Sequence, residues 1–207
     1  MNTKLINKIL TNLDSIPDST LMMSYKNCHV AGLHSIVLNN NMGKLTRFFY
    51  ADKTHNMHKN LSNLMFSLGV HDHKYDLTLT NLFGRAINVN FSVEQVEYPN
   101  KGNVSFHTFS DGKATRTDTY IPRALLKQTA IKCLSDNPMF IDKDDLHTVY
   151  VPKGEPAAWL VEEGEEVKDF TRLYTNTPII NESTNYQRFS DANEVRKFIR
   201  NIFVDIR

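Results

Sequence analysis

The sequence predicts a mainly β fold, an antiparallel barrel or sandwich with helices at its two ends. Apolar residues alternate with polar ones over residues 77–83 and again over residues 87–93. Such period-two alternation is typical of antiparallel strands with one buried face. Turn-forming clusters such as Asn39–Gly43 separate these short segments. Clear helical spacing is found close to the chain ends, so the strands occupy the middle of the chain.

Paired strand segments are expected at several places along the chain. Each pair consists of two β-rich runs joined by residues that favour turns. The predicted pairs are Leu33–Leu38 with Lys44–Tyr50 and Val104–Phe109 with Ala114–Tyr120. A strong turn signal, Pro152–Pro156, lies between the runs Val149–Val151 and Ala157–Val161. The segment Pro122–Leu134 fits either a helix or a strand distorted by its proline.

A helix is predicted near each end of the chain. Leu5–Leu13 carries apolar residues at helical spacing and is closed by Pro17. The last helix begins with Asp191 as its cap and Glu194 three residues on. Its apolar stripe consists of Val195, Phe198, Ile199 and Ile202.

A single domain over residues 1–207 is expected, because no linker divides the chain. We divide it into an N-terminal helical segment (1–30), a β-barrel core (31–165) and a C-terminal extension with a helix (166–207).

Of the 207 residues, 41% are hydrophobic and 23% charged, and the formal net charge is +1. This balance gives no electrostatic reason to expect a nucleic-acid or membrane partner. Cys28 and Cys133 lack the spacing of a zinc or redox pair, so a cytoplasmic location with reduced thiols is expected.

The segment Val70–Asp76 holds the densest group of chemically versatile side chains. On a strand, His71 and His73 point to the same face, so both imidazoles can reach one point. Imidazole nitrogens bind transition metals well, and a nearby carboxylate, here Asp76, could complete a facial set. Strict alternation puts Asp76 on the opposite face, so a bulge or turn must intervene if it is a ligand. Asp72 also faces away, and can act only as an outer contact.

Another histidine, His147, begins a β run far along the chain and is the candidate third ligand. His107 is an alternative ligand, although a core histidine is the simpler interpretation of both His107 and His34. His55 and His58 fit surface positions. The remaining polar and aromatic candidates have structural interpretations: Glu162–Glu166 as a solvated acidic turn and Trp159 as a core residue, or one lining a cavity.

The stretch Leu68–Ala86 resembles the first cupin motif, with two histidines one residue apart, a carboxylate, and Gly84 at the expected spacing. It is most similar to cupin-like proteins, many uncharacterised or phage-encoded, that carry His-Asp-His followed by an aromatic-Asp pair, here Tyr75-Asp76. His147–Val149 and Trp159–Val161 resemble the later strands. The sequence departs from the family in two places. The position of the usual Glu ligand is Leu77 or Thr78 here. The Pro-x-Gly of the second cupin motif normally precedes its histidine, whereas here Pro152-Lys153-Gly154 follows His147.

This resemblance implies a cupin-like antiparallel β-barrel or jelly roll with flanking helices. It also implies a divalent transition metal (Fe, Zn, Ni or Mn) held by His71, His73 and His147, with or without Asp76. The implied function is a metal-dependent enzyme acting on a small molecule, of dioxygenase, isomerase or lyase type, with no catalytic side chain assigned. The alternative is a non-catalytic protein that binds or sequesters a ligand in the same pocket. A homodimer is a further expectation of the family.

Overall fold

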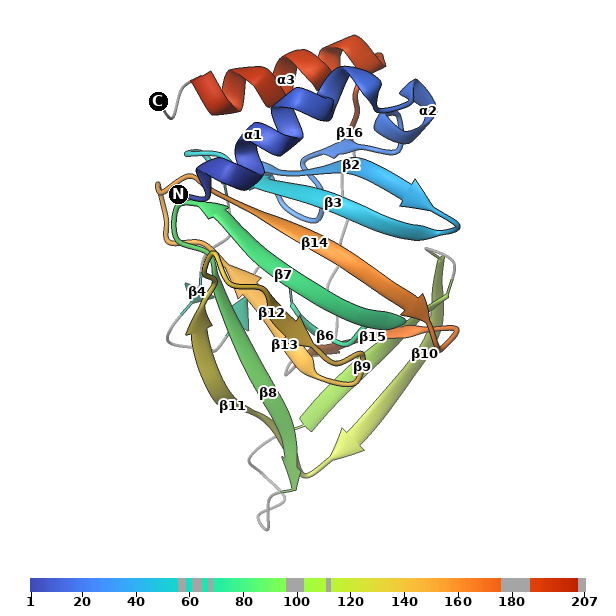
Figure 1. The fold of residues 1–207 in the computed structure, drawn as a ribbon. Coiled ribbons are helices and arrows are strands. Elements are labelled where there is room, and N and C mark those ends of the chain that lie inside the picture. Colours follow the sequence, from blue (N-terminus) through green and yellow to red (C-terminus); the bar gives the residue numbers. More distant parts are fainter. Residues whose placement is uncertain are drawn as a thin grey trace.

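Figure 1 shows the fold in a computed structural model, which describes residues 1–55, 59–60, 65–66, 69–95, 103–110, 113–175 and 187–204. Most of these residues belong to two seven-stranded sheets, called sheet I and sheet II below. Every strand pair in them is antiparallel. The predicted mainly β, antiparallel architecture is therefore confirmed.

Sheet I has the strand order β12-β7-β14-β3-β2-β1-β16. Its centre is the predicted hairpin of β2 and β3, followed by the long strand β14 and then β7. The strands are β1 (Tyr25–Lys26), β2 (Leu33–Asn41), β3 (Lys44–Ala51), β7 (Tyr75–Phe83), β12 (Met139–Ile141), β14 (Ala157–Glu166) and β16 (Gln187–Arg188).

Sheet II has the strand order β10-β9-β15-β6-β13-β8-β11. Its strands are β6 (Val70–His71), β8 (Ile87–Gln95), β9 (Asn103–Ser110), β10 (Lys113–Pro122), β11 (Ala124–Cys133), β13 (Leu146–Tyr150) and β15 (Thr171–Thr175). A separate pair is formed by β4 (Lys59–Asn60) and β5 (Met65–Phe66).

The segment that fitted either a helix or a strand is the strand β11. It pairs along its whole length with β8, with a register irregularity between Gln128 and Ala130. Pro122 ends the preceding strand, and Arg123 makes the turn with a positive φ of 57°. Because the proline lies at a strand end, it removes no hydrogen bond from the middle of the sheet.

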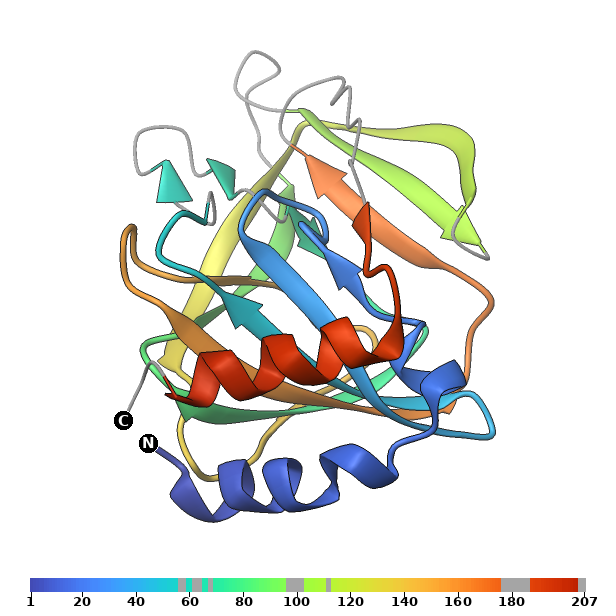
Figure 2. The ribbon, with the colours of Figure 1, turned by 90° about the horizontal axis from the view of Figure 1, so that it is seen from above.

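The helices cover the outer face of sheet I, away from sheet II (Figures 1 and 2). Caps at both long helices satisfy backbone N–H groups that have no partner within the helix. The Leu5 N–H donates to Asn2 Oδ1 over 3.1 Å, and the Glu194 N–H donates to Asp191 Oδ1 over 2.8 Å, as predicted for the last helix. The helices are α1 (Thr3–Asn12), the 3₁₀ turn η1 (Leu13–Ser15), α2 (Asp18–Leu21) and α3 (Ala192–Val204).

Alternation along the strands of sheet I separates two apolar clusters. Phe48 and Leu160 lie on the outer face, where they pack with residues of α1 and α3. Their chain neighbours Phe49 and Trp159 lie on the inner face, where their rings stack with centroids 5.6 Å apart. Trp159 is thus a core residue between the sheets, with 3% of its surface exposed. The same alternation controls which polar side chains reach the space between the sheets.

Among the described residues, no helix combines the length and the apolar character needed to cross a lipid bilayer.

Candidate metal centre

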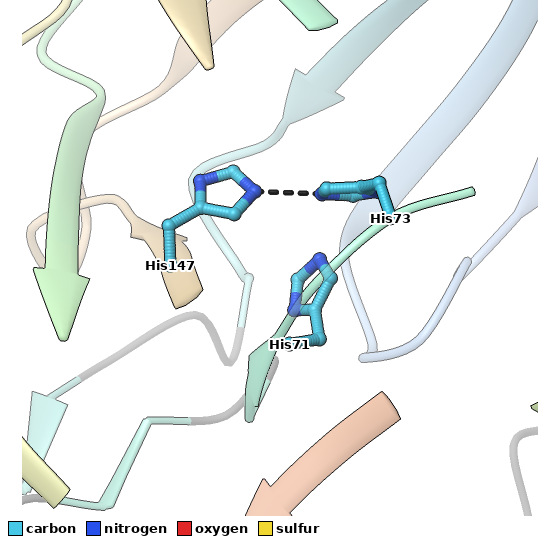
Figure 3. Close-up of side chains that lie close together, drawn as sticks. All are labelled: His71, His73 and His147. Carbon is cyan, nitrogen blue, oxygen red and sulfur yellow. Dashed lines mark hydrogen bonds between the residues drawn. The ribbon is translucent and has the colours of Figure 1, made fainter. Parts of the chain in front are cut away.

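Three histidines that are far apart in sequence meet on the inner face of sheet II (Figure 3). The pairing of β6 with β13 places His71 directly opposite His147. His73 follows two residues after His71, beyond the end of β6, where its backbone N–H donates to Lys143 O over 3.1 Å. The ligand-capable atoms of the three side chains all lie within 4.8 Å of one another.

The three rings are arranged around one point. The ring centroids of His71 and His73 are 4.7 Å apart, those of His73 and His147 are 4.9 Å apart, and those of His71 and His147 are 5.2 Å apart. The Nε2 atoms of His73 and His147 approach to 2.7 Å. His71 and His73 share a face as predicted, although the strand carrying His71 ends before it reaches His73.

A buried amide fixes the tautomer of His147. Its Nδ1 lies 2.6 Å from Asn88 Oδ1, and the Asn88 amide nitrogen donates to Asn90 Oδ1 over 2.5 Å. Asn88 therefore presents its oxygen to the ring and accepts the Nδ1 proton. With the proton on Nδ1, the Nε2 of His147 carries a lone pair that faces the other two histidines. Metal-binding histidines commonly have an outer contact of this kind.

Burial keeps all three imidazoles uncharged. It lowers the pKa of His71, although a hydrogen bond to the Gly69 backbone opposes the shift. Burial, with the nearby His71, lowers the pKa of His73 and of His147 well below the usual value. At neutral pH these side chains are therefore neutral, which is the protonation state in which imidazole donates to a metal.

Neither aspartate of the motif joins this group in the structure. Asp76 lies on β7, and its Oδ1 accepts a hydrogen bond of 2.9 Å from the Lys143 backbone. Asp72 is 1% exposed and accepts from the backbone and the side chain of Arg172, with Lys168 Nζ 3.1 Å away. Asp72 thus holds the segment after β6 against β15 and the residues just before β15 instead of orienting an imidazole.

The donor set fits a transition metal ion. Three neutral imidazoles suit Zn, Fe or Ni, whereas Mn prefers oxygen ligands, so the all-nitrogen set favours the first three. Two nitrogens bound to one zinc at 2.0–2.1 Å lie about 3.3 Å apart. His73 and His147 would therefore separate by roughly half an ångström on binding. Three protein ligands leave coordination positions open for a small molecule or water.

The other histidines have different positions. His34 is buried beneath α3, with its Nε2 3.2 Å from Asp52 Oδ2 and its ring against Phe198. His55 is also buried, at 4% exposed, so the prediction of a surface position for it is wrong; its Nε2 lies 3.1 Å from the Glu155 carbonyl oxygen. His58 and the side chain of His107 lie outside the part of the chain that the structure describes.

Sequence reasoning missed a polar group on the inner face of sheet I, opposite the histidines. Glu163 is buried, with 4% of its side chain exposed, so the interpretation of its surroundings as a solvated acidic turn is wrong for this residue. It accepts from Arg47 Nε over 2.8 Å and from the Tyr75 hydroxyl over 2.9 Å. The signal was present in the alternation, because Trp159, Val161 and Glu163 occupy every second position of one strand.

Tyr75 and His29 connect this polar group to the histidines. The ring of Tyr75 stacks on His73, with centroids 6.1 Å apart and an angle of 21°. His29 retains solvent-accessible surface, yet burial, then the proximity of His71 and of Arg47, lowers its pKa to about 4.

The chain matches no protein-family model and no curated protein sequence. Solved structures with some similarity include hydroxypropylphosphonic acid epoxidase from S. wedmorenis (12% identity, TM-score 0.34, 68% of this chain and 54% of that one). A hydroquinone 1,2-dioxygenase in complex with Cd²⁺ and 4-hydroxybenzonitrile has 10% identity and a TM-score of 0.35, with 62% of each chain covered. Drosophila melanogaster CENP-C bound to CAL1 has 9% identity and a TM-score of 0.36, with 79% of this chain and all (100%) of that one covered. The chain thus spans less than two thirds of the length of the two enzymes, and similarities of this size carry no inference about activity.

Proposed function

We propose that this protein is a metal-dependent enzyme of the cupin type that acts on a small molecule. The observation that supports the proposal most is the convergence of His71, His73 and His147, as neutral imidazoles, on the buried inner face of sheet II. His73 Nε2 and His147 Nε2 share a hydrogen bond of 2.7 Å, and a bound cation would take the place of its proton.

The residues of the chain have separate roles in this proposal. His71, His73 and His147 hold the ion, and Asn88 keeps His147 in the tautomer that can donate. Tyr75 stacks on His73 and limits the rotation of its ring. Asp76 is left out of the ligand set, because its Oδ1 is engaged by the Lys143 backbone. A bound divalent ion supplies Lewis acidity, or oxygen activation if it is iron.

Metal analysis tests the proposal directly. Protein purified without a polyhistidine tag is incubated separately with Zn²⁺, Fe²⁺, Ni²⁺ or Mn²⁺, desalted, and analysed for elemental content. We expect one equivalent of Zn, Fe or Ni per chain, with less Mn retained. His71→Ala and His147→Ala should each weaken metal binding more than about 100-fold, beyond the roughly 10–100-fold loss typical of outer contacts.

A matched control separates the cluster from buried histidines in general. His34→Gln changes a buried histidine on the other side of sheet I and should keep the metal stoichiometry of the unchanged protein. Equal metal content in the His147→Ala and unchanged proteins would contradict the proposed centre. Stoichiometric metal without turnover of any small molecule would instead favour the non-catalytic, ligand-binding alternative.

A further inference from the structure

Arg47 lies on the inner face of sheet I, where a charged side chain is unexpected. Its strand β3 pairs with β14 so that Arg47 is opposite Val161, and two residues further along, Phe49 belongs to the apolar cluster between the sheets. The Arg47 side chain is 25% exposed. A guanidinium held in such a place usually has a defined set of acceptors.

The guanidinium is anchored through one edge only. Its Nε donates to Glu163 Oε1, which leaves four N–H groups on the two Nη atoms. Within the described part of the chain, neither Nη atom has a hydrogen-bond acceptor. Arg47 thus has two Nη nitrogens whose N–H groups are unused within the described part of the chain.

Glu163 positions Arg47 without occupying this free edge. One carboxylate oxygen, Oε1, accepts from Arg47 and Tyr75, and the other, Oε2, accepts from the Leu45 backbone N–H over 3.3 Å. The carboxylate is therefore engaged on both oxygens. Its charge holds the pKa of Arg47 above the usual value despite the opposing effect of burial.

The free edge of Arg47 belongs to the same interior as the histidine cluster. Tyr75 joins the two sites, because its hydroxyl bonds to Glu163 while its ring stacks on His73. His29 lies near both Arg47 and His71. A surface hollow of about 320 Å³ also borders Tyr75, at the end of sheet I formed by Lys44 and Gly164. A small molecule bound beside Tyr75 would therefore lie between the histidines and Arg47.

We propose that Arg47 binds the carboxylate group of the small molecule that the site takes, with Glu163 and Tyr75 as positioning residues. The inference rests on the proposed function, which places the other end of the ligand at the metal centre. Two parallel N–H groups match the two oxygens of a carboxylate, which gives both affinity and orientation. Because Glu163 already offsets the charge of Arg47, a monoanionic carboxylate leaves less uncompensated negative charge than a dianionic phosphate.

The test compares two probes of the same shape, benzoate and benzamide, with the metal-loaded protein. Titrations are followed by the Arg Nε–Hε signals in two-dimensional NMR, and the Arg47 signal is assigned by its loss in Arg47→Lys. We expect benzoate to shift the Arg47 signal and to bind at least about tenfold more tightly than benzamide. Inorganic phosphate should bind more weakly than benzoate.

Variants test the residue itself. Arg47→Met should weaken benzoate binding at least about tenfold and leave benzamide binding unchanged. The control Arg85→Met removes an exposed arginine paired with Glu155 and should bind benzoate like the unchanged protein. If Arg47→Met does not fold, the double variant Arg47→Met, Glu163→Gln removes both charges together and takes its place.

Three outcomes would overturn the inference: equal binding of benzoate and benzamide, unchanged benzoate binding after loss of Arg47, or tighter binding of phosphate than of benzoate. Metal content is measured on the same samples. Benzoate binding that depends on Arg47 in a protein that retains no metal would reject the metal centre and keep the anion site. Stoichiometric metal binding, together with benzoate binding that does not depend on Arg47, would keep the metal centre and reject the anion site.

Discussion

The two faces of sheet I carry different kinds of side chain, although they are built from the same strands. The outer face is largely apolar, with His34 as a buried polar exception, and lies beneath α1 and α3. The inner face is apolar around Trp159 and Phe49 but charged at the end that holds Arg47 and Glu163. Sheet II faces this charged end with its three histidines.

This difference separates the part of the molecule that stabilises the fold from the part that is available for chemistry. Apolar burial is the main stabilising contribution in folding, and it needs no special geometry. Buried ionic and polar groups contribute little net stability, because desolvation opposes their attraction. Their presence between the sheets therefore indicates a binding function more than a structural one, and each prediction below changes one side of this contrast.

The largest effect is expected from the outer face. Phe48 is fully buried there and its ring lies 5.6 Å from that of Phe203 in α3. Phe48→Ala should lower the free energy of unfolding by about 3–5 kcal/mol, because it removes apolar contacts and leaves a cavity. Urea unfolding followed by circular dichroism measures this change. The control Phe140→Ala, at a position 64% exposed, should change stability by less than about 0.5 kcal/mol.

Folded Phe48→Ala should still bind one equivalent of metal at low temperature, since no contact of the histidines changes. Loss of metal from the folded variant would show that the two faces are not independent.

A smaller effect, confined to metal binding, is expected from the inner face of sheet II. Asn88→Ala removes the acceptor for His147 Nδ1 and should weaken metal binding about 10–100-fold. Competition with a chromophoric chelator measures the affinity. Asn88→Asp keeps an acceptor oxygen at the same place and should retain the affinity of the unchanged protein. If Asn88→Ala binds metal as tightly as the unchanged protein, the contact between Asn88 and His147 has no role in metal binding.

The smallest effect is expected from His34, a histidine on the helix-covered side. Burial lowers its pKa from the ordinary 6.5, although Asp52 opposes the shift. Its Nδ1 is buried with no hydrogen-bond partner among the described residues, so adding a proton there buries an unpaired N–H. The unfolded chain therefore takes up the proton first, and the contribution of His34 to stability, complete above pH 6.5, decreases as the pH falls below that value.

Unfolding free energies measured at intervals from pH 7.5 to pH 5 test this expectation. His34→Gln should show a shallower loss of stability below pH 6.5 than the unchanged protein. The difference between the two proteins isolates His34, because the buried histidines of the cluster titrate in both. Parallel curves would mean that His34 has the same pKa in the folded and unfolded chains.

Much of the architecture could be predicted from local patterns. Alternation over residues 77–83 and 87–93 predicted β7 and β8, and the Asp191–Glu194 spacing predicted the start of the last helix. The His71-x-His73 spacing predicted that two imidazoles share a face, and the later His147 was the expected third member. The division of the chain into domain segments and a homodimeric state stay predictions.

The sequence by itself determined which side chains alternate and which residue types could bind a metal, because both depend on neighbours within a few positions. Only the tertiary structure decided that β6 pairs with β13, which brings His71 and His147 together across 76 positions of the chain. It also decided that Asp76 bonds to a backbone instead of joining the histidines, and that Arg47 and Glu163 meet across two strands. These contacts depend on strand order and register, which are fixed by the packing of the whole chain and not by any short segment.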